Sequence, residues 1–206
     1  MNSESNIRTI LPISFYRGTD VTDIARKLLG KYLCTRINQK PVTSGVIVET
    51  EAYAAQGDKA CHASDYNRTD RNDAMFREGG IAYVYLCYGI HNLFNVVTNR
   101  SGEPEAVLIR AVEPEEGIEI MKKRREYKEV KPELTAGPGR LTEALGIDRS
   151  HYGTNLQSEP VWIEDRGKHI SASDIDSSPR IGVSYAGEDA KKPWRFTISG
   201  NRWVSR

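Results

Sequence analysis

The sequence predicts an α+β fold: a single domain built on a curved, largely antiparallel sheet, with few helices and a protruding β-hairpin. Three observations support this prediction. Predicted strands outnumber predicted helices, strands and helices do not alternate regularly, and no linker divides the 206 residues. We expect one domain over residues 1–206, in which residues 1–8 form a disordered N-terminus.

The first part of the chain predicts one helix, two strands and a long loop. A helix follows the capping residue Asp20, because apolar residues recur at helical spacing until Gly30 ends the pattern. Strands are predicted at 31–37 and 42–53, joined by a polar turn. Residues 54–80 show no periodicity. A compact domain seldom keeps so long a loop without a function, so this loop is a candidate site.

A β-hairpin opens the next part of the chain. Its strands at 81–88 and 90–98 are separated by Gly89, which indicates a tight turn or a bulge. A strand at 106–112 follows. A helix is then predicted over 114–127, because a proline and two glutamates suit a first helical turn.

The last part of the chain predicts short elements between polar turns. A short helix at 141–145 follows a Gly-Pro-Gly sequence. Strands are predicted at 161–164, 180–184 and 195–199, and a polar turn is predicted at 171–179.

Composition excludes several classes of protein. Lys and Arg number 29 against 28 Asp and Glu, so nucleic-acid binding must be argued from local residues and not from net charge. The chain lacks an apolar stretch long enough for a membrane span and lacks a signal-peptide pattern, so we expect an intracellular protein. Three cysteines without a Cys-x-x-Cys pair provide neither a disulfide framework nor a zinc ribbon. We expect no metal and no cofactor.

Two glutamates on the strand at 42–53 are candidates for acid–base chemistry. Glu49 and Glu51 share one face of the strand, about 7 Å apart. At this separation one carboxylate can act as a base while the other orients it or forms an ion pair. The alternative is a solvated face with a salt bridge, which these residues alone favour by roughly two to one.

Aromatic residues are concentrated in the strand before Gly89. Tyr83 and Tyr85 share one face, while Tyr88 faces the other way near the hairpin tip. Aromatic rings stack on nucleic-acid bases with about 1–3 kcal/mol each, but they also pack ordinary sheets, and composition alone favours packing. Asn95 lies in an apolar run and needs a buried partner or a ligand. The residues favour a satisfied core amide.

The irregular loop holds two further candidates. His62 has Cys61 beside it, but this pair does not make a metal site without two more ligands at suitable spacing. Residues 68–72 can bind phosphate through arginine, or can be simple solvated charge.

Eight short motifs occur in order between Ile13 and Ser205. They are VETEAY at 48–53, DKACH at 58–62, RN at 71–72 with MF at 75–76, YVY at 83–85 with YG at 88–89 and Asn95, LIRA at 108–111 with Pro114, GPGRL at 137–141, RIG at 180–182 and KPWRF at 192–196. Together they resemble the alkyladenine (3-methyladenine, or methylpurine) DNA glycosylase family over nearly the whole chain.

This resemblance implies roles for individual residues. It makes Glu51 the general base that activates water, with Arg110 holding that water or a neighbouring phosphate. It places a flipped base between Tyr53, His62 and Tyr85. It makes Tyr88 the wedge that enters the minor groove, and Asn95 the residue that crowds the 2-amino group of guanine. Further DNA contacts implied by the resemblance are Thr69, Arg71, Met75 and Arg140.

The resemblance also implies an activity. It indicates a monofunctional DNA glycosylase of base-excision repair that flips alkylated purines, 3-methyladenine and 7-methylguanine, out of double-stranded DNA and hydrolyses their N-glycosidic bond, leaving an abasic site. It leaves deaminated and etheno purines open as substrates. It further implies a monomer without a cofactor, located in the cytoplasm at the nucleoid in a bacterium or in the nucleus in a eukaryote.

Two alternatives from other classes remain. A hydrolase of free nucleosides would share the chemistry of Glu51 but would have no use for an exposed Tyr88. A non-catalytic sensor of distorted DNA would need Tyr88 and Arg71 while tolerating the loss of Glu51.

Overall fold

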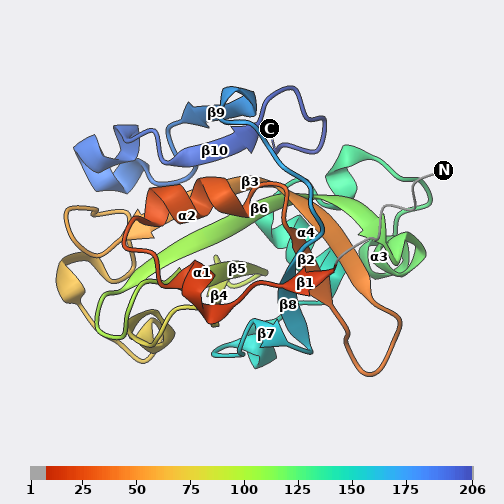
Figure 1. Ribbon diagram of the computed structural model, residues 1–206, viewed down its shortest axis with the longest axis horizontal. Helices are drawn as coiled ribbons and strands as arrows, with labels where there is room; N and C mark the ends of the chain where they lie inside the picture. The colour runs from red at the N-terminus through yellow and green to blue at the C-terminus, as the bar shows by residue number, and fades with distance from the viewer. Residues whose placement is uncertain (1–7, 206) are drawn as a thin grey trace.

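One antiparallel sheet crosses the molecule and carries the other elements (Figure 1). The computed structural model describes residues 8–205. The main path runs β1-β8-β2-β3-β6-β5-β4, while β10 pairs with β3 and β9, and β7 pairs with β8. The strands are β1 (Thr9–Ile10), β2 (Tyr32–Thr35), β3 (Thr43–Ala54), β4 (Ala82–Cys87), β5 (His91–Thr98), β6 (Glu105–Glu116), β7 (Gln157–Ser158), β8 (Val161–Asp165), β9 (Ile175–Ser178) and β10 (Arg195–Ile198). The predicted fold class is confirmed.

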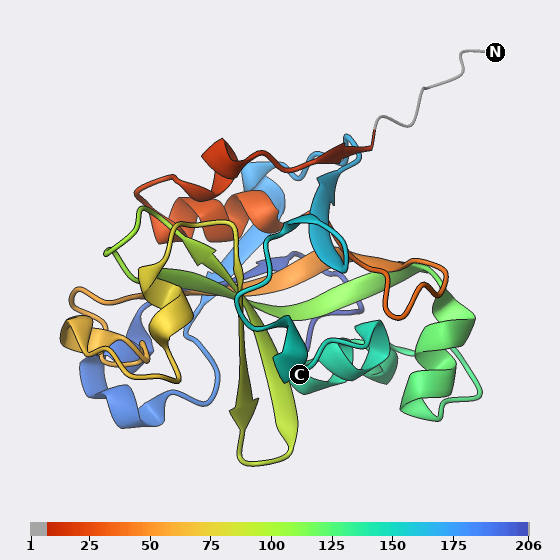
Figure 2. The same ribbon diagram turned by 90° about the horizontal axis from the view of Figure 1, so that it is seen from below.

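Helices cover both faces of the sheet. α1 (Ile13–Tyr16) and α2 (Val21–Leu28) lie on one face, and α3 (Ile118–Arg125) and α4 (Pro138–Leu145) lie on the other (Figure 2). Short 3-10 helices occupy connecting segments. They are η1 (Ser64–Tyr66), η2 (Asp73–Phe76), η3 (Pro132–Leu134), η4 (Arg149–His151), η5 (Ala172–Asp174) and η6 (Ser184–Lys191).

The helix α2 forms for the reasons that its sequence indicates. The Asp20 carboxylate accepts hydrogen bonds from the backbone N–H groups of Thr22 and Asp23, which would otherwise lack partners. The apolar side chains on one side of α2 are buried against β3 and β6. Thr50 of β3 donates to the carbonyl of Ala25 at 2.9 Å, which ties the helix to the sheet directly behind the glutamates.

Strands β3 and β6 form the centre of the sheet and carry its polar residues. β3 is buried along its length except for the half-buried Tyr53. The pairing of β3 with β6 is irregular at Val48 and again beside Arg110. Such bulges redirect side chains, and they frequently occur next to active sites. Arg110, at one of these positions, donates hydrogen bonds to Glu49 and Glu51 of β3.

The β4–β5 hairpin projects from the body of the protein (Figure 2). Tyr88 and Gly89 have φ angles of 50° and 74°, and the N–H of Ile90 donates to the carbonyl of Cys87, as in a type I′ turn. Tyrosine seldom adopts a positive φ. The tip side chains are strongly exposed, Tyr88 to 88 % and Ile90 to 72 %.

The predicted helix over 114–127 is wrong at its start. β6 continues to Glu116, and Pro114 pairs with Gly45 at an irregular point of the ladder. A proline is tolerated there because its missing N–H breaks no regular strand pairing. Gly117, with a φ of 68°, ends the strand, and α3 then begins at Ile118.

The predicted strand at 180–184 is also wrong. The strand lies earlier, as β9, inside the predicted turn at 171–179. Residues 180–183 form a loop instead, because a buried ion pair holds Arg180 and because Gly182 has a φ of 78°, outside the range of a strand. This loop lies beside the candidate active site.

The predicted disordered start at residues 1–8 lies outside the described residues except for Arg8, whose guanidinium pairs with Glu116 at 2.7 Å. Within residues 8–205, no helix has both the length and the apolar character needed to cross a membrane.

Candidate active site

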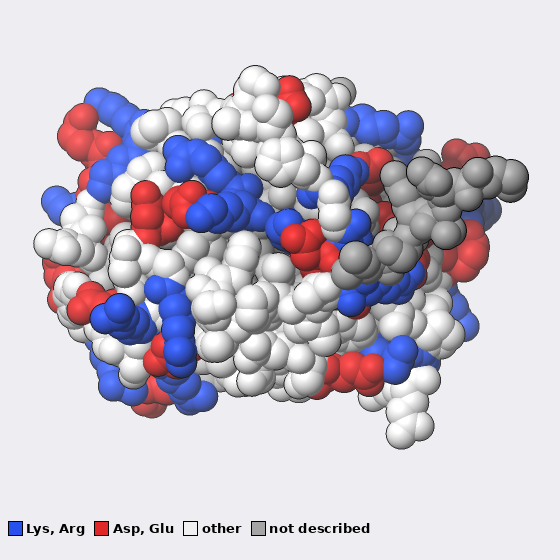
Figure 3. Space-filling model, viewed as in Figure 1, with Lys and Arg blue, Asp and Glu red and all other residues white. Residues whose placement is uncertain are grey.

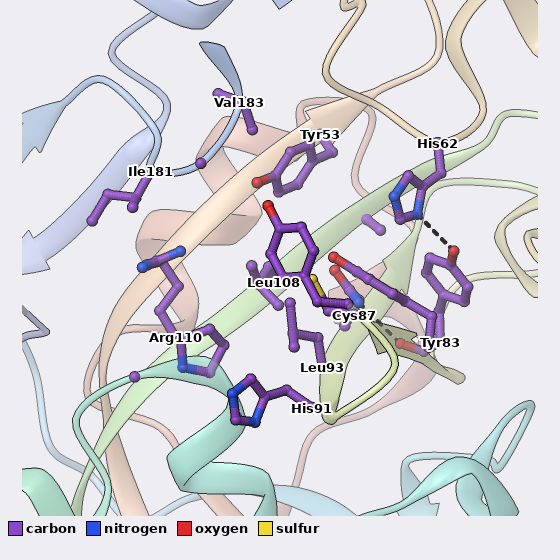
Figure 4. Close-up of a pocket in the computed structure, with 18 of the residues that line it drawn as sticks. Tyr53, His62, Tyr83, Cys87, His91, Leu93, Leu108, Arg110, Ile181 and Val183 are labelled. Carbon is purple, nitrogen blue, oxygen red and sulfur yellow. Dashed lines mark hydrogen bonds between the residues drawn. The ribbon is translucent and has the colours of Figure 1, made fainter. Parts of the chain in front are cut away.

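A cavity of about 830 Å³ opens between the β4–β5 hairpin, the first turn of α4 and the loop that leads into η6 (Figure 4). The sequence-predicted residues that line it are Tyr53, His62, Arg71, Met75, Tyr85, Tyr88, Asn95, Arg110 and Arg140. Two predicted residues do not line it. Glu51 is buried behind its wall, and Thr69 is exposed on the adjacent loop. The cavity therefore brings together residues from five separate parts of the chain.

Aromatic rings form one wall of the cavity. The rings of His62 and Tyr85 meet edge to face, with centroids 4.6 Å apart. The hydroxyl of Tyr83 lies 2.8 Å from Nδ1 of His62 and holds the imidazole in place (Figure 4). Tyr83 is itself buried, as the packing interpretation expects. This wall offers flat, rigid surfaces to a planar ligand.

His62 is uncharged near neutral pH. Burial of the imidazole, together with the nearby positive charge of Arg71, lowers the pKa of His62 to about 4. The guanidinium of Arg71 also lies over the ring of Tyr85, 5.0 Å from its centroid. A cationic ligand would meet a neutral imidazole here and would not be repelled by it.

Asn95 is both a satisfied core amide and a cavity residue. Its Nδ2 donates to the carbonyl of Tyr83 at 3.0 Å, across the hairpin from its own strand. The two possibilities that the sequence leaves open, a buried partner and a ligand, are therefore compatible. Met75 is also buried, on η2, and contributes an apolar side chain to the cavity.

The two glutamates are buried, so the interpretation as a solvated face is wrong. Both have 0 % exposure. Bulges and the pairing of β3 with β6 and β10 enclose this face, which the alternation of residues alone does not show.

Glu51 is held by three groups that line the cavity. Its Oε2 accepts hydrogen bonds from the hydroxyl of Tyr53 at 2.7 Å and from Nη1 of Arg110 at 3.2 Å. Its Oε1 accepts from the backbone N–H of Ile181 at 2.7 Å. A carboxylate oxygen can accept two hydrogen bonds, so Oε1 keeps capacity for one further donor.

Glu49 has a different environment. Its carboxylate accepts from Nε of Arg110 and Nε of Arg195, and from both the backbone N–H and the hydroxyl of Ser205. Burial alone would raise the pKa of Glu49, but Arg110, Ser205 and Arg195 outweigh it and hold this pKa below its usual value. Glu49 is thus an ionised partner for two arginines and an anchor for the C-terminal segment.

Arg110 connects the two carboxylates. Its neighbours on β6, Ile109 and Ala111, pair with Thr50 and Glu49, so Arg110 itself lies at the bulge. The buried guanidinium donates to both glutamates and still lines the cavity.

The rim of the cavity combines exposed aromatic and basic side chains. α4 can approach the hairpin closely because Gly139 has no side chain. A Cβ atom at this position would lie only 2.9 Å from the ring of His91. Arg140, the next residue, lines the cavity, and its guanidinium donates to the carbonyl of Ala136. Tyr185, 67 % exposed, closes another side of the rim and donates to the carbonyl of Ala60.

Sequence reasoning missed Ile181, Tyr185 and the pair of Asp58 with Arg180. Ile181 and Arg180 belong to the RIG motif at 180–182. The sequence predicts a strand there, however, and not the loop that brings Ile181 to Glu51. Asp58 and Arg180 are 122 positions apart, and no local pattern predicts that they pair.

Across residues 8–205, no group of three or more His, Cys, Asp or Glu side chains is placed to hold a metal ion.

The charged surface on the far side of the sheet differs from this rim. Figure 3 shows the face over α1 and α2, which is opposite the hairpin tip, and there acidic and basic side chains alternate around an uncharged area. A mixed face of this kind does not favour a polyanion, whereas the cavity rim places Arg71 and Arg140 near an opening.

The structure thus combines a buried carboxylate, an aromatic cavity in front of it and an exposed hairpin tip beside the opening. The chain belongs to the methylpurine-DNA glycosylase family, whose signature matches residues 14–202. It is therefore a DNA glycosylase, a hydrolase of N-glycosyl bonds that serves DNA repair.

Several bacterial relatives support this assignment. A protein of Chlamydia felis named "Putative 3-methyladenine DNA glycosylase" is 47 % identical over 192 residues, which cover 92 % of this chain and 96 % of the relative. A Bacillus licheniformis protein of the same name is 46 % identical, over 95 % of this chain and 96 % of the relative. One from Bacillus thuringiensis is 45 % identical, over 95 % and 98 %.

Proposed function

We propose that the protein removes alkylated purines, 3-methyladenine and 7-methylguanine, from double-stranded DNA. The lesion flips into the aromatic cavity, its N-glycosidic bond is hydrolysed, and an abasic site remains. The single observation that carries this proposal is the geometry of Glu51, which lies directly behind the cavity wall and is held by Tyr53, Arg110 and Ile181.

Glu51 acts as the general base in this proposal. Cleavage of the bond between base and sugar passes through a sugar cation, and a water molecule attacks C1′. Oε1 of Glu51 keeps a free acceptor position for the proton of that water, and the carboxylate charge stabilises the cation. Arg110 orients the carboxylate and holds the water or a neighbouring phosphate.

The rings of Tyr53, His62 and Tyr85 select the base. A purine methylated at N3 or N7 carries a positive charge, which favours contact with electron-rich tyrosine rings. The low pKa of His62 supports this role, because a protonated imidazole would repel the same base. Asn95 crowds the 2-amino group of normal guanine.

Neutral lesions are poorer substrates in this proposal. Hypoxanthine and etheno purines leave readily only after protonation, and His62 with a pKa of about 4 is a weak source of protons near pH 7. We therefore expect slower release of deaminated and etheno purines than of the cationic bases.

The abasic product is left uncut. No lysine lines the cavity among residues 8–205, so the site offers no amine for a Schiff base and no route to strand cleavage by that chemistry.

Contacts with the duplex come from the rim. Tyr88 at the hairpin tip enters the minor groove and fills the space that the flipped nucleotide leaves. Arg71 and Arg140, which both line the cavity, face phosphates together with the exposed Thr69, and Met75 also contacts the DNA. We further propose that the protein works as a single-domain monomer on chromosomal DNA, at the nucleoid if the source is bacterial.

Incubation with methylated duplex DNA tests the proposed function. We expect 3-methyladenine and 7-methylguanine to appear as free bases by chromatography, while the strands stay intact until alkali cleaves the abasic sites. Methylated free nucleosides and an unmethylated duplex are the controls. Equal release from free nucleosides would favour the nucleoside hydrolase, and tight binding to lesion DNA without any release would favour the non-catalytic sensor.

A further inference from the structure

Asp58 and Arg180 form a buried ion pair behind the cavity wall. Both side chains are fully buried. Nη1 and Nη2 of Arg180 each donate to one oxygen of the Asp58 carboxylate at 2.6 Å. The same guanidinium donates to the carbonyls of Ala52 at 2.8 Å and Asp189 at 3.1 Å. Arg180 thus joins β3, the long loop and η6.

The ion pair fixes the loop that reaches Glu51. Ile181 follows Arg180 directly, and its N–H donates to Oε1 of Glu51 at 2.7 Å. Gly182 has a φ of 78°, which lets the chain turn away immediately after this contact. Because the guanidinium of Arg180 is held on three sides, the neighbouring N–H keeps a constant direction.

The same guanidinium fixes the tyrosine that bonds Glu51. Cζ of Arg180 lies 4.7 Å from the centre of the Tyr53 ring and covers one of its faces. The hydroxyl of Tyr53 donates to Oε2 of Glu51. Two of the three hydrogen-bond donors to Glu51 therefore depend on Arg180.

Stability alone does not account for this pair. A buried ion pair often contributes no more to stability than apolar residues of the same volume, because both charges lose their hydration. Nε of Arg180 is buried without a partner among the described residues, which is a further cost. The geometry that this pair imposes on its neighbours explains it better.

We propose that Arg180 and Asp58 are positioning residues for base excision: they hold the N–H of Ile181 and the hydroxyl of Tyr53 against Glu51. Neither residue touches the base or the water. This inference rests on the proposed role of Glu51 as the base. Loss of the pair misdirects the carboxylate, and a shift of about 1 Å at a catalytic group reduces a rate by about 100-fold.

Two substitutions test the proposal. Arg180→Lys keeps the positive charge but cannot make the paired contact, and Asp58→Asn keeps the shape but removes the negative charge. The readouts are the single-turnover rate of base release at saturating enzyme and the Kd for a lesion duplex. We expect the rate to fall by about 10-fold to 100-fold in both variants, with the Kd within about threefold.

Arg166→Lys is the matched control. Arg166 is also a buried arginine, paired with Glu164 and Glu116, but it does not line the cavity or contact Glu51. Arg166→Lys and Arg180→Lys should both lower the melting temperature. Only Arg180→Lys should lower the rate of base release by more than about twofold. Equal rates in the two variants would overturn the proposal.

Ile181→Pro decides the matter if the arginine variants do not fold. It removes the N–H that reaches Glu51 but also changes the side chain, so it is compared with Ile181→Val, which changes the side chain and keeps the N–H. We expect Ile181→Pro to lose rate to a similar extent, and an unchanged rate would overturn the inference. These contradicting results can be told apart from failure of the proposed function, because in that case the wild-type protein itself would release no base.

Discussion

The hairpin tip and the two buried glutamates behind the cavity wall are built in opposite ways. At the tip, Tyr88 and Ile90 project into solvent from a turn with a left-handed backbone. Behind the cavity wall, Glu49 and Glu51 are completely buried, and each carboxylate oxygen accepts at least one hydrogen bond. The side chains of the tip are largely surrounded by solvent, whereas the two carboxylates are fixed by hydrogen bonds.

This difference separates two tasks. Groups that stabilise charge in a transition state act best when the protein holds them in place beforehand. Exposed apolar side chains instead gain their contacts when a partner arrives, so they affect binding and opening of the duplex. Substitutions of the two buried glutamates should change the chemical step or stability, and substitutions at the tip should change neither.

The largest expected effect is at Glu51. Glu51→Gln should abolish base release, because an amide keeps the shape of the side chain but cannot take a proton from water. Binding of lesion DNA should stay within about tenfold of wild type. Single-turnover release and a binding titration on the same duplex measure the two quantities. A variant that still releases base at the wild-type rate would remove Glu51 from the mechanism.

Glu49 should matter more for folding than for chemistry. Glu49→Gln leaves Arg110 and Arg195 without their shared negative charge, and breaking a buried pair in this way costs about 3 kcal/mol. Urea unfolding should show this loss, while base release by the folded variant should fall much less than in Glu51→Gln. Equal loss of activity in the two variants would leave the assignment of the base unsupported.

Tyr88 should affect only duplex opening. Tyr88→Ala removes the side chain that fills the vacated space, so excision from a fully paired duplex should fall by about tenfold or more. The strongly exposed side chain supports little of the fold, and the free energy of unfolding should change by less than about 0.5 kcal/mol. An equal drop for paired and bulged lesions would make Tyr88 an ordinary packing residue.

The smallest effect concerns the protonation of His62. Its pKa is about 4 in the folded protein against 6.5 for the ordinary side chain, so the unfolded chain takes up this proton first as the pH falls. The stability that His62 contributes is complete above pH 6.5 and is lost as the pH falls through about 4. An NMR titration of the His62 ring should show no protonation between pH 6 and 8. A midpoint near 6.5 would contradict the neutral cavity wall.

The sequence predicts the two regions to different extents. The hairpin and its tip follow from strand propensity and from Gly89, which are local signals. The burial of Glu49 and Glu51 could not be predicted, because it depends on bulges and on β10, which joins the sheet from the end of the chain. Alternation along one strand does not show what covers it.

The two wrongly predicted elements have the same cause, because contacts with distant parts of the chain outweigh the local sequence pattern. Pro114 looks like the start of a helix, but pairing with β3 outweighs the local preference. Residues 180–184 look like a strand, but the ion pair with Asp58 decides their path. The resemblance to known glycosylases identified nine cavity residues by number, whereas the contacts that orient Glu51 became visible only in three dimensions.

One measurement tests the division between the two regions most directly. Single-turnover rates of base release are compared for wild type, Glu51→Gln and Tyr88→Ala, each with the same lesion in a paired duplex and in a bulge. We predict that Glu51→Gln loses release on both substrates and that Tyr88→Ala loses it only on the paired duplex. Recovery of Glu51→Gln on the bulge, or an equal loss by Tyr88→Ala on both substrates, would contradict this account.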